Sequence, residues 1–128
     1  MRLLLDTHVL LWWLDDDPQM SVRSRTLIGR GDNAVVVSIV SIWEIAIKAG
    51  LGRLEVPTDL RGYLQGQIAR NQFELLPVLL EHAVAVRDLP LHHRDPFDRM
   101  LIAQSQIERL ALVARDARMK AYEVEVLW

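Results

Sequence analysis

The sequence contains no cysteine among its 128 residues. This absence excludes disulfide bonds, thiolate metal sites and cysteine nucleophiles. Long apolar runs are also absent: the run at residues 3–5 ends at Asp6, too early for a signal peptide, and no segment approaches the length of a membrane helix. There is no internal repeat and no linker-like or low-complexity stretch. We therefore expect a single soluble domain over residues 1–128, located in the cytoplasm and not associated with a membrane.

The chain also lacks a marked excess of charge of either sign. Hydrophobic residues make up 51% of the chain and charged residues 25%, as in ordinary globular proteins. The net charge of -2 provides no overall attraction to nucleic acid. Among the 15 basic residues, however, only Lys48 and Lys120 are lysines. Arginine suits bidentate phosphate contacts, although codon bias in a GC-rich genome explains its abundance equally well.

Short apolar runs alternate with helical patterns along the chain. Strands are expected at residues 3–5, 34–37, 73–77, 112–113 and 124–127, and helices at 7–14, 21–29, 42–49, 59–70, 81–87 and 95–107. Continuous apolar strands separated by helices are typical of a parallel sheet covered on both faces. The pattern thus predicts an α/β protein, a three-layer α/β/α sandwich.

Two acids stand directly after predicted strands. Asp6 follows the first strand and Asp116 follows residues 112–113. Function in such sheets gathers at the carboxyl ends of the strands. Each acid also has a structural explanation, because Asp6 would cap the helix at residues 7–14 and Asp116 a short helix at 117–121. Position alone leaves both interpretations open.

Two further acids lie inside predicted helices. Glu44 is surrounded by bulky apolar residues, yet its spacing from Ser41 fits a capping box and its spacing from Lys48 fits an ion pair. Asp95, followed by proline, is typical of a helix N-cap, with Asp98 at the third helical position. Several carboxylates at one sheet edge would repel one another, and a hard divalent cation would remove that cost. Such a site suits phosphodiester hydrolysis.

Four segments in order resemble PIN-domain nucleases, and most closely the VapC-type toxins of bacterial toxin–antitoxin pairs. They are LLDTH at residues 4–8, SIVSIWEI at 38–45, HHRDPFDRMLIAQ at 92–104 and LVARD at 112–116. The resemblance spans nearly the whole chain. It implies a five-stranded parallel sheet and a Mg²⁺ or Mn²⁺ site built from the four acids Asp6, Glu44, Asp98 and Asp116.

The resemblance also implies an activity and partners. The expected activity is endonucleolytic cleavage of RNA by metal-activated water, with homodimers and inhibition by a small cognate antitoxin. The alternative is a PIN-like protein that binds RNA or an antitoxin without cutting. A haloacid-dehalogenase phosphatase would need an acid at His8, and no glycine-rich loop suggests a nucleotide-binding module.

Further residues are expected to position the acids or to contact substrate: Thr7, Ser41, His93, Arg94, Asp95, Arg99 and Arg115. His8, His92 and Arg118 are expected near the mouth of the acidic site, and Trp12 and Trp13 are expected in the core. The family pattern has Thr or Ser where Ala114 stands, so one hydroxyl contact should be missing. Met119 replaces a common aromatic residue, which we interpret as a packing change.

Overall fold

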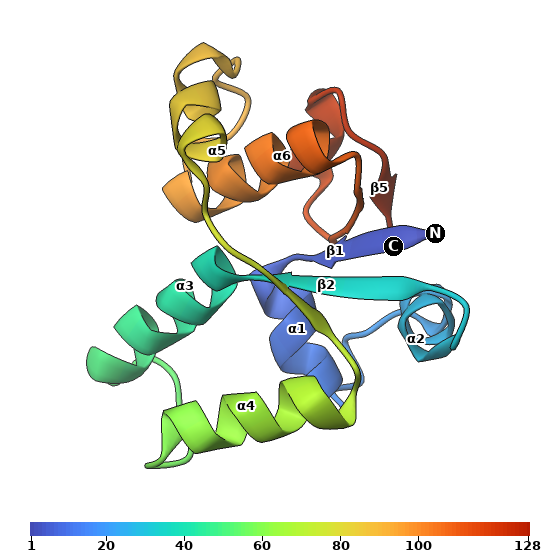
Figure 1. The fold of residues 1–128 in the computed structure, drawn as a ribbon, viewed down its shortest axis with the longest axis vertical. Helices are drawn as coiled ribbons and strands as arrows, with labels where there is room; N and C mark the ends of the chain where they lie inside the picture. Colours follow the sequence, from blue (N-terminus) through green and yellow to red (C-terminus); the bar gives the residue numbers. More distant parts are fainter.

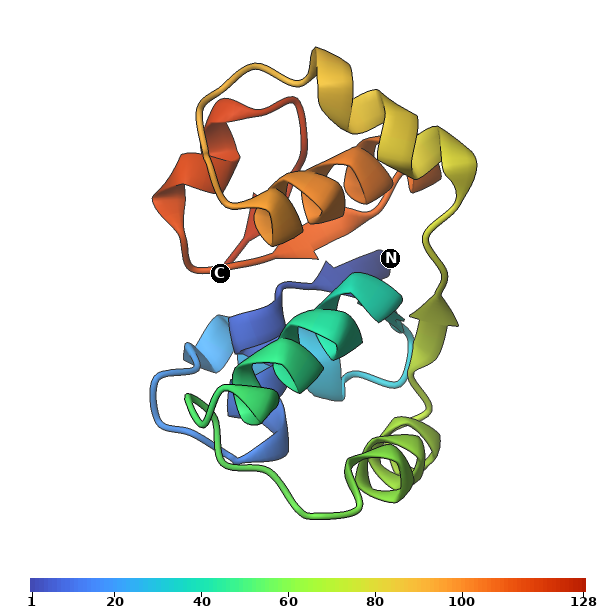
Figure 2. The same cartoon turned by 90° about the vertical axis from the view of Figure 1, so that its left-hand side faces the viewer.

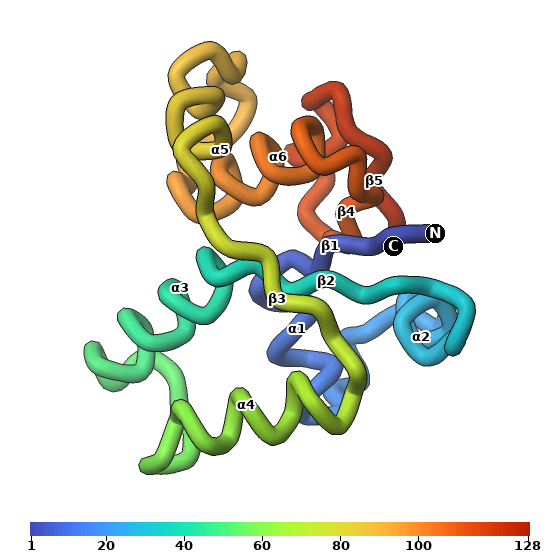
Figure 3. Tube along the Cα trace, viewed as in Figure 1, coloured from blue at the N-terminus to red at the C-terminus, as the bar shows by residue number.

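The computed structural model describes all residues 1–128 and contains one five-stranded sheet in which every strand pair is parallel (Figure 1). In sheet order the strands are β3 (Glu74–Leu76), β2 (Ala34–Ser38), β1 (Arg2–Leu5), β4 (Ala111–Val113) and β5 (Val126–Leu127), traced in Figure 3. The predicted α/β fold with a parallel sheet is confirmed. The first strand lies at the centre of this sheet.

Helices cover both faces of the sheet. They are α1 (Thr7–Leu14), α2 (Val22–Gly29), α3 (Ile39–Gly50), α4 (Leu60–Arg70), α5 (Leu80–Ala85) and α6 (Pro96–Glu108), with 3₁₀ turns η1 (Val86–Asp88) and η2 (Ala117–Ala121). In Figures 1 and 2, α1 to α4 lie on one side of the sheet, whereas α5 and α6 lie on the other. The result is the predicted three-layer sandwich.

Alternating side chains of the central strand divide the core in two. Leu3 and Leu5 belong to the apolar cluster under α1 to α4, and Leu4 belongs to the cluster under α6. All three leucines have no exposed surface. Successive strand residues point to opposite faces, so a strand buried on both sides must be apolar throughout. This explains why the three buried residues of β1, which follow the exposed Arg2 and precede Asp6, are all leucines.

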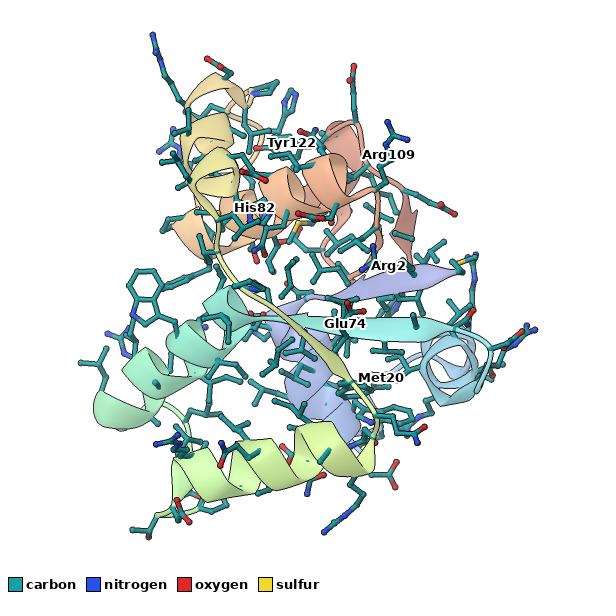
Figure 4. The ribbon with its side chains drawn as sticks, viewed as in Figure 1. Arg2, Met20, Glu74, His82, Arg109 and Tyr122 are labelled. Atoms are coloured by element: carbon teal, nitrogen blue, oxygen red, sulfur yellow. The ribbon has the colours of Figure 1, made fainter.

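Local capping sets where several helices begin. Asp6, Asp59, Asp95 and Asp116 are the N-caps of α1, α4, α6 and η2, each accepting a backbone N–H as sequence predicts for aspartate. An ion pair between Arg2 on β1 and Glu74 on β3, labelled in Figure 4, lies at the opposite, amino end of the sheet. Of these four caps, Asp6, Asp95 and Asp116 line one pocket, whereas Asp59 does not.

One helix start was predicted wrongly. Helix α3 begins at Ile39 and not after Ser41, because the hydroxyl of Ser38 accepts the backbone N–H of Val40 at 3.0 Å. Strand β2 therefore passes directly into the helix. Ser41 lies within the helix, so its predicted capping box with Glu44 does not form.

The two departures from the family pattern lie in the core. Ala114 is 1% exposed and Met119 is fully buried, and both belong to the apolar cluster beneath α6. The packing interpretation of Met119 fits this position. Separately, none of the helices combines the length and the apolar character that crossing a membrane requires.

Candidate metal centre

The acid that ends the central strand is held by the backbone of the next helix. The carboxylate of Asp6 accepts the N–H of His8 at 3.1 Å, and its side chain is only 7% exposed. The His8 ring lies 3.7 Å from the same oxygen, and the interaction with this carboxylate raises the pKa of His8 against the opposing effect of burial. Asp6 is thus both the predicted cap and a buried carboxylate at the sheet edge.

Asp116 lies at the end of the neighbouring strand β4. Its carboxylate accepts the N–H of Arg118 at 3.0 Å and is gripped by the same residue's guanidinium, with Nη2 to Oδ2 at 2.7 Å. This contact holds the pKa of Asp116 well below its usual range. An exposed cation of the chain therefore covers this acid.

Asp98 is the acid of this group whose ionised form is most disfavoured by its surroundings. Burial, followed by the negative charges of Asp6, Asp95 and Glu44, raises the pKa of Asp98 to about 8. A carboxyl group is disfavoured as an anion when it is desolvated among like charges. The sheet edge therefore holds more carboxylates than it can keep ionised without a further cation.

Glu44 reaches the cluster from α3. Its side chain is 3% exposed, and Oε2 accepts a hydrogen bond from Lys48 Nζ at 2.6 Å, the ion pair that the sequence spacing predicts. Its other oxygen, Oε1, is buried without any partner. A buried carboxylate oxygen left unpaired is costly, so this atom is a candidate ligand.

His93 lies between two of the acids. Its Nε2 is 3.0 Å from Asp98 Oδ2 and 3.1 Å from Asp116 Oδ2. Its Nδ1 accepts the backbone N–H of Asp95 at 3.1 Å, so the ring proton is on Nε2 and points to the carboxylates. The sequence grouped His93 with the residues expected to position the acids or to contact substrate, and the structure buries it between two of the acids.

A hydrogen-bonded hub holds the loop that carries His93. The Tyr122 hydroxyl accepts the backbone N–H groups of His92 and His93 at 3.1 and 2.9 Å. The Arg99 guanidinium donates to the carbonyls of Val86, Leu89 and Pro90. Arg99 was expected to contact phosphate, but its donors are directed at this loop. No local sequence signal pairs Tyr122 with residues 29 positions earlier.

The remaining predicted residues range from buried to exposed. Thr7 donates a buried hydrogen bond of 2.9 Å to Ser41, which ties α1 to α3 and hence Asp6 to the helix of Glu44. Asp95 accepts from Phe97 and Asp98, as predicted for a cap. Arg94 and Arg115 are exposed. His92 packs against Tyr122 at the rim of a different pocket.

An open pocket of about 350 Å³ gives access to the acids. It is lined by Asp6, His8, Trp12, Asp95, Asp98, Arg115, Asp116 and Arg118. Glu44 is not part of this lining, although its charge is close enough to raise the pKa of Asp98. The pocket is negative at its base and has two arginines on its wall, a charge pattern that suits a cation bridged to a phosphate.

The donor set fits a hard divalent ion. The carboxylates are oxygen ligands of the type that Mg²⁺ and Mn²⁺ prefer, Glu44 Oε1 has no hydrogen-bond partner, and burial and like charges disfavour Asp98 as an anion. His93 Nε2 and one oxygen each from Asp98 and Asp116 lie within 4.8 Å of one another. The centre therefore has the composition of a metal site.

A second polar group at the same edge was not predicted. Ser38 donates to Gln104 Oε1 at 2.6 Å, Gln104 Nε2 donates to the carbonyl of Pro77 at 3.2 Å, and His82 Nε2 lies 2.8 Å from Glu108 Oε1. His82 lies between α5 and α6 in Figure 4, and its Nδ1 accepts from the backbone of Leu79. This buried network connects β2 with α5 and α6.

Comparison with known proteins agrees with this architecture. The PIN domain family model matches residues 3–125. The chain is 30% identical over 122 residues to Ribonuclease VapC22 of Mycobacterium tuberculosis (strain ATCC 25618 / H37Rv), covering 93% of this chain and 90% of that protein.

Solved structures with the same fold come from toxin–antitoxin complexes. VapBC2 from Rickettsia felis, bound to a promoter DNA fragment, has a TM-score of 0.74 at 13% identity, covering 99% of this chain and 98% of that chain. VapBC-5 from Mycobacterium tuberculosis has a TM-score of 0.61 at 20% identity, with 98% and 97% covered. At these identities the likeness shows the fold alone.

Proposed function

Because this chain belongs to the PIN-domain family, we propose that it is a Mg²⁺- or Mn²⁺-dependent endoribonuclease that acts as the toxin of a toxin–antitoxin pair. One observation carries this proposal. Asp6, Asp98 and Asp116 line one pocket, burial and the charges of Asp6 and Glu44 disfavour Asp98 as an anion, and Glu44 Oε1 has no hydrogen-bond partner. A stable fold gains nothing from this arrangement, whereas a divalent cation would relieve both features.

Asp6, Glu44, Asp98 and Asp116 would hold the ion. When bound, it would supply the Lewis acidity that activates water and stabilises the leaving oxygen of a phosphodiester. His93 donates its Nε2 proton to Asp116 and lies 3.0 Å from Asp98, and so helps to fix the direction of their oxygens. The Thr7–Ser41 bond sets the spacing of α1 and α3.

The arginines at the pocket wall have a different role. Arg118 neutralises Asp116 in this structure, and its guanidinium would be available to a substrate phosphate if a bound cation neutralised Asp116 instead. Arg115 lies on the same wall with donors to spare, since one contact to Gln19 at 3.2 Å is its only hydrogen bond. Both residues are proposed phosphate contacts.

Partners follow from the relatives. The neighbours described as VapBC complexes contain a toxin together with its antitoxin, and we infer that a small cognate antitoxin also binds this chain. We further infer that residues 1–128 are a single nuclease domain, that it forms a homodimer, and that it acts on RNA in the cytoplasm.

The test combines stability with cleavage. Addition of Mg²⁺ or Mn²⁺ should raise the melting temperature of the metal-free protein by an amount equivalent to about 1–3 kcal/mol and start cleavage of a mixed RNA pool. Asp6→Asn should remove both effects, whereas the exposed Asp15→Asn on the far end of α1 should remove neither. Cleavage that persists in EDTA would overturn the metal dependence. A cation-induced shift without cleavage of any RNA would favour the binding-only alternative.

A further inference from the structure

The acidic pocket has one apolar wall, and that wall is aromatic. Trp12 is the only hydrophobic residue among those lining the pocket. Its ring is half-buried and packs against Trp128 with centroids 5.7 Å apart. A tryptophan expected in the core therefore keeps part of its surface toward the site.

Two polar planar groups flank this tryptophan. The His8 ring lies 5.9 Å from it at an angle of 41°, and the Arg115 guanidinium carbon lies 5.6 Å from its centroid. The Arg115 contact is a cation–π arrangement, and the His8 side chain is 59% exposed. Trp12 thus lies beside two polar planar groups, and all three line the same pocket as the acids.

This combination matches single-stranded RNA more closely than any other ligand. Unpaired bases stack on aromatic side chains and guanidinium planes, and the arginines beside them contact phosphates. Asp6, Asp98 and Asp116 line the pocket next to the tryptophan, so a phosphate held near the acids would place an adjoining base over the ring. A merely structural tryptophan would not need flanking groups of this kind within a charged pocket.

We propose that Trp12, flanked by His8 and Arg115, is a stacking subsite for an unpaired nucleobase adjoining the phosphodiester at the acidic centre. The ligand class rests on the proposed function. The subsite itself rests on the geometry of the pocket. It gives the enzyme a preference for unpaired over duplex RNA, because a base within a helix is already stacked on its neighbours.

The experiment measures binding without cleavage. In an Asp98→Asn background, fluorescence anisotropy compares an oligoadenylate of about 12 nucleotides, within the usual site size, with a base-free ribose-phosphate chain of equal length. Adding Trp12→Leu should weaken binding of the oligoadenylate roughly 10-fold, as expected for loss of one stacked base, and leave binding of the base-free chain unchanged. Trp12→Phe, which keeps a ring, should restore most of the affinity.

Trp13→Leu is the matched control. Trp13 is the next residue of the same helix and is also half-buried, but it donates to Asn71 at 3.0 Å and lines a separate pocket between α1 and α4. It should change neither affinity. Arg115→Met, at an exposed side chain that folding does not require, should weaken both ligands because it removes a phosphate contact as well.

Three results would overturn the subsite. They are unchanged oligoadenylate binding by Trp12→Leu, an equal loss for the base-free chain, and no detectable binding of oligoadenylate to the Asp98→Asn protein at low salt. None of them depends on whether the wild-type protein cuts RNA. Failure of the proposed nuclease activity would instead appear as absent cleavage with the binding pattern intact.

Discussion

Two buried polar groups lie at the same edge of the sheet, and they are built on opposite principles. In the network of Ser38, Gln104, His82 and Glu108, each of these side chains has a hydrogen-bond partner. In the acidic centre, Glu44 Oε1 has none and the carboxyl of Asp98 is crowded by like charges. A fully satisfied network rigidifies a fold, whereas an unsatisfied charge cluster lowers its stability. The difference separates the part of this edge that builds the protein from the part that acts.

The largest effect is expected at Asp98, where one substitution should lower activity and raise stability. Asp98→Asn should reduce RNA cleavage by on the order of 100-fold or more, the loss typical of removing one group from a preorganised site. It should also increase the free energy of unfolding in EDTA, because the amide carries no charge beside Asp6 and Glu44. Cleavage assays and urea unfolding measure the two quantities. A variant that is both active and destabilised would show that Asp98 is a structural residue.

Gln104→Leu should have the converse result. The Ser38 hydroxyl and the Pro77 carbonyl would lose their partner in a buried position, which should cost about 2 kcal/mol or more of unfolding free energy. Cleavage by the folded protein should change little. Gln106→Leu, at an exposed position of the same helix, is the control and should leave stability nearly unchanged. Equal losses of unfolding free energy in the two variants would mean that the hydrogen bonds of Gln104 do not stabilise the fold.

The pH dependence of the metal-free protein should come from the acidic centre. The folded pKa of Asp98, about 8, exceeds that of an unfolded aspartate, so the neutral form stabilises the fold and this contribution disappears as pH rises toward 8. The free energy of unfolding in EDTA should therefore fall between about pH 5 and pH 8, by at most about 1.4 kcal/mol per pH unit. The melting temperature, measured across the same range, should fall with it.

Two other groups bear on this slope. The raised pKa of His8 acts in the same direction, since its protonated form is also favoured in the folded state and is lost as pH rises. The low pKa of Asp116 contributes stability only above the pKa of an unfolded aspartate, and this contribution is complete throughout the measured range. Asp98→Asn should therefore retain only the shallower slope of His8. An unchanged slope in that variant would contradict the assignment.

The smallest effect is expected at Ser105. It tests whether a buried polar atom without a hydrogen-bond partner indicates a functional residue. Ser105 Oγ on α6 is buried and unpartnered, like Glu44 Oε1, but it carries no charge. Ser105→Ala should stabilise the protein by about 0.5–1 kcal/mol, by removing an unpaired hydroxyl and improving helix propensity, with cleavage unaffected. Thermal unfolding and a cleavage assay check this. A loss of cleavage would extend the functional group into α6 beyond Asp98.

Much of this arrangement follows from local rules. Apolar runs locate β1, β2 and β4, and the caps at Asp6, Asp95 and Asp116 depend on a side chain and the backbone two or three residues away. The convergence of Asp6 and Asp116 follows from parallel strands ending at one edge. These features could be predicted because each depends on short-range chemistry or on topology.

The remaining features depend on contacts between distant segments. Both Ser38 and Ser41 precede apolar helical residues, and only the path of β2 decides which one caps α3. The central position of His93 depends on Tyr122, and the structural use of Arg99 depends on carbonyls of a loop that has no regular pattern. Sequence periodicity carries no information about such pairings.

The central position of β1 has a consequence for how the protein is made. Asp6 precedes Asp116 along the chain by most of the domain, yet the strands that they follow, β1 and β4, pair side by side in the sheet. A nascent chain lacking β4 and Asp116 carries three of the acids without the strand that brings the fourth beside them. The acidic centre is therefore complete only once β4 has been translated and has paired with β1.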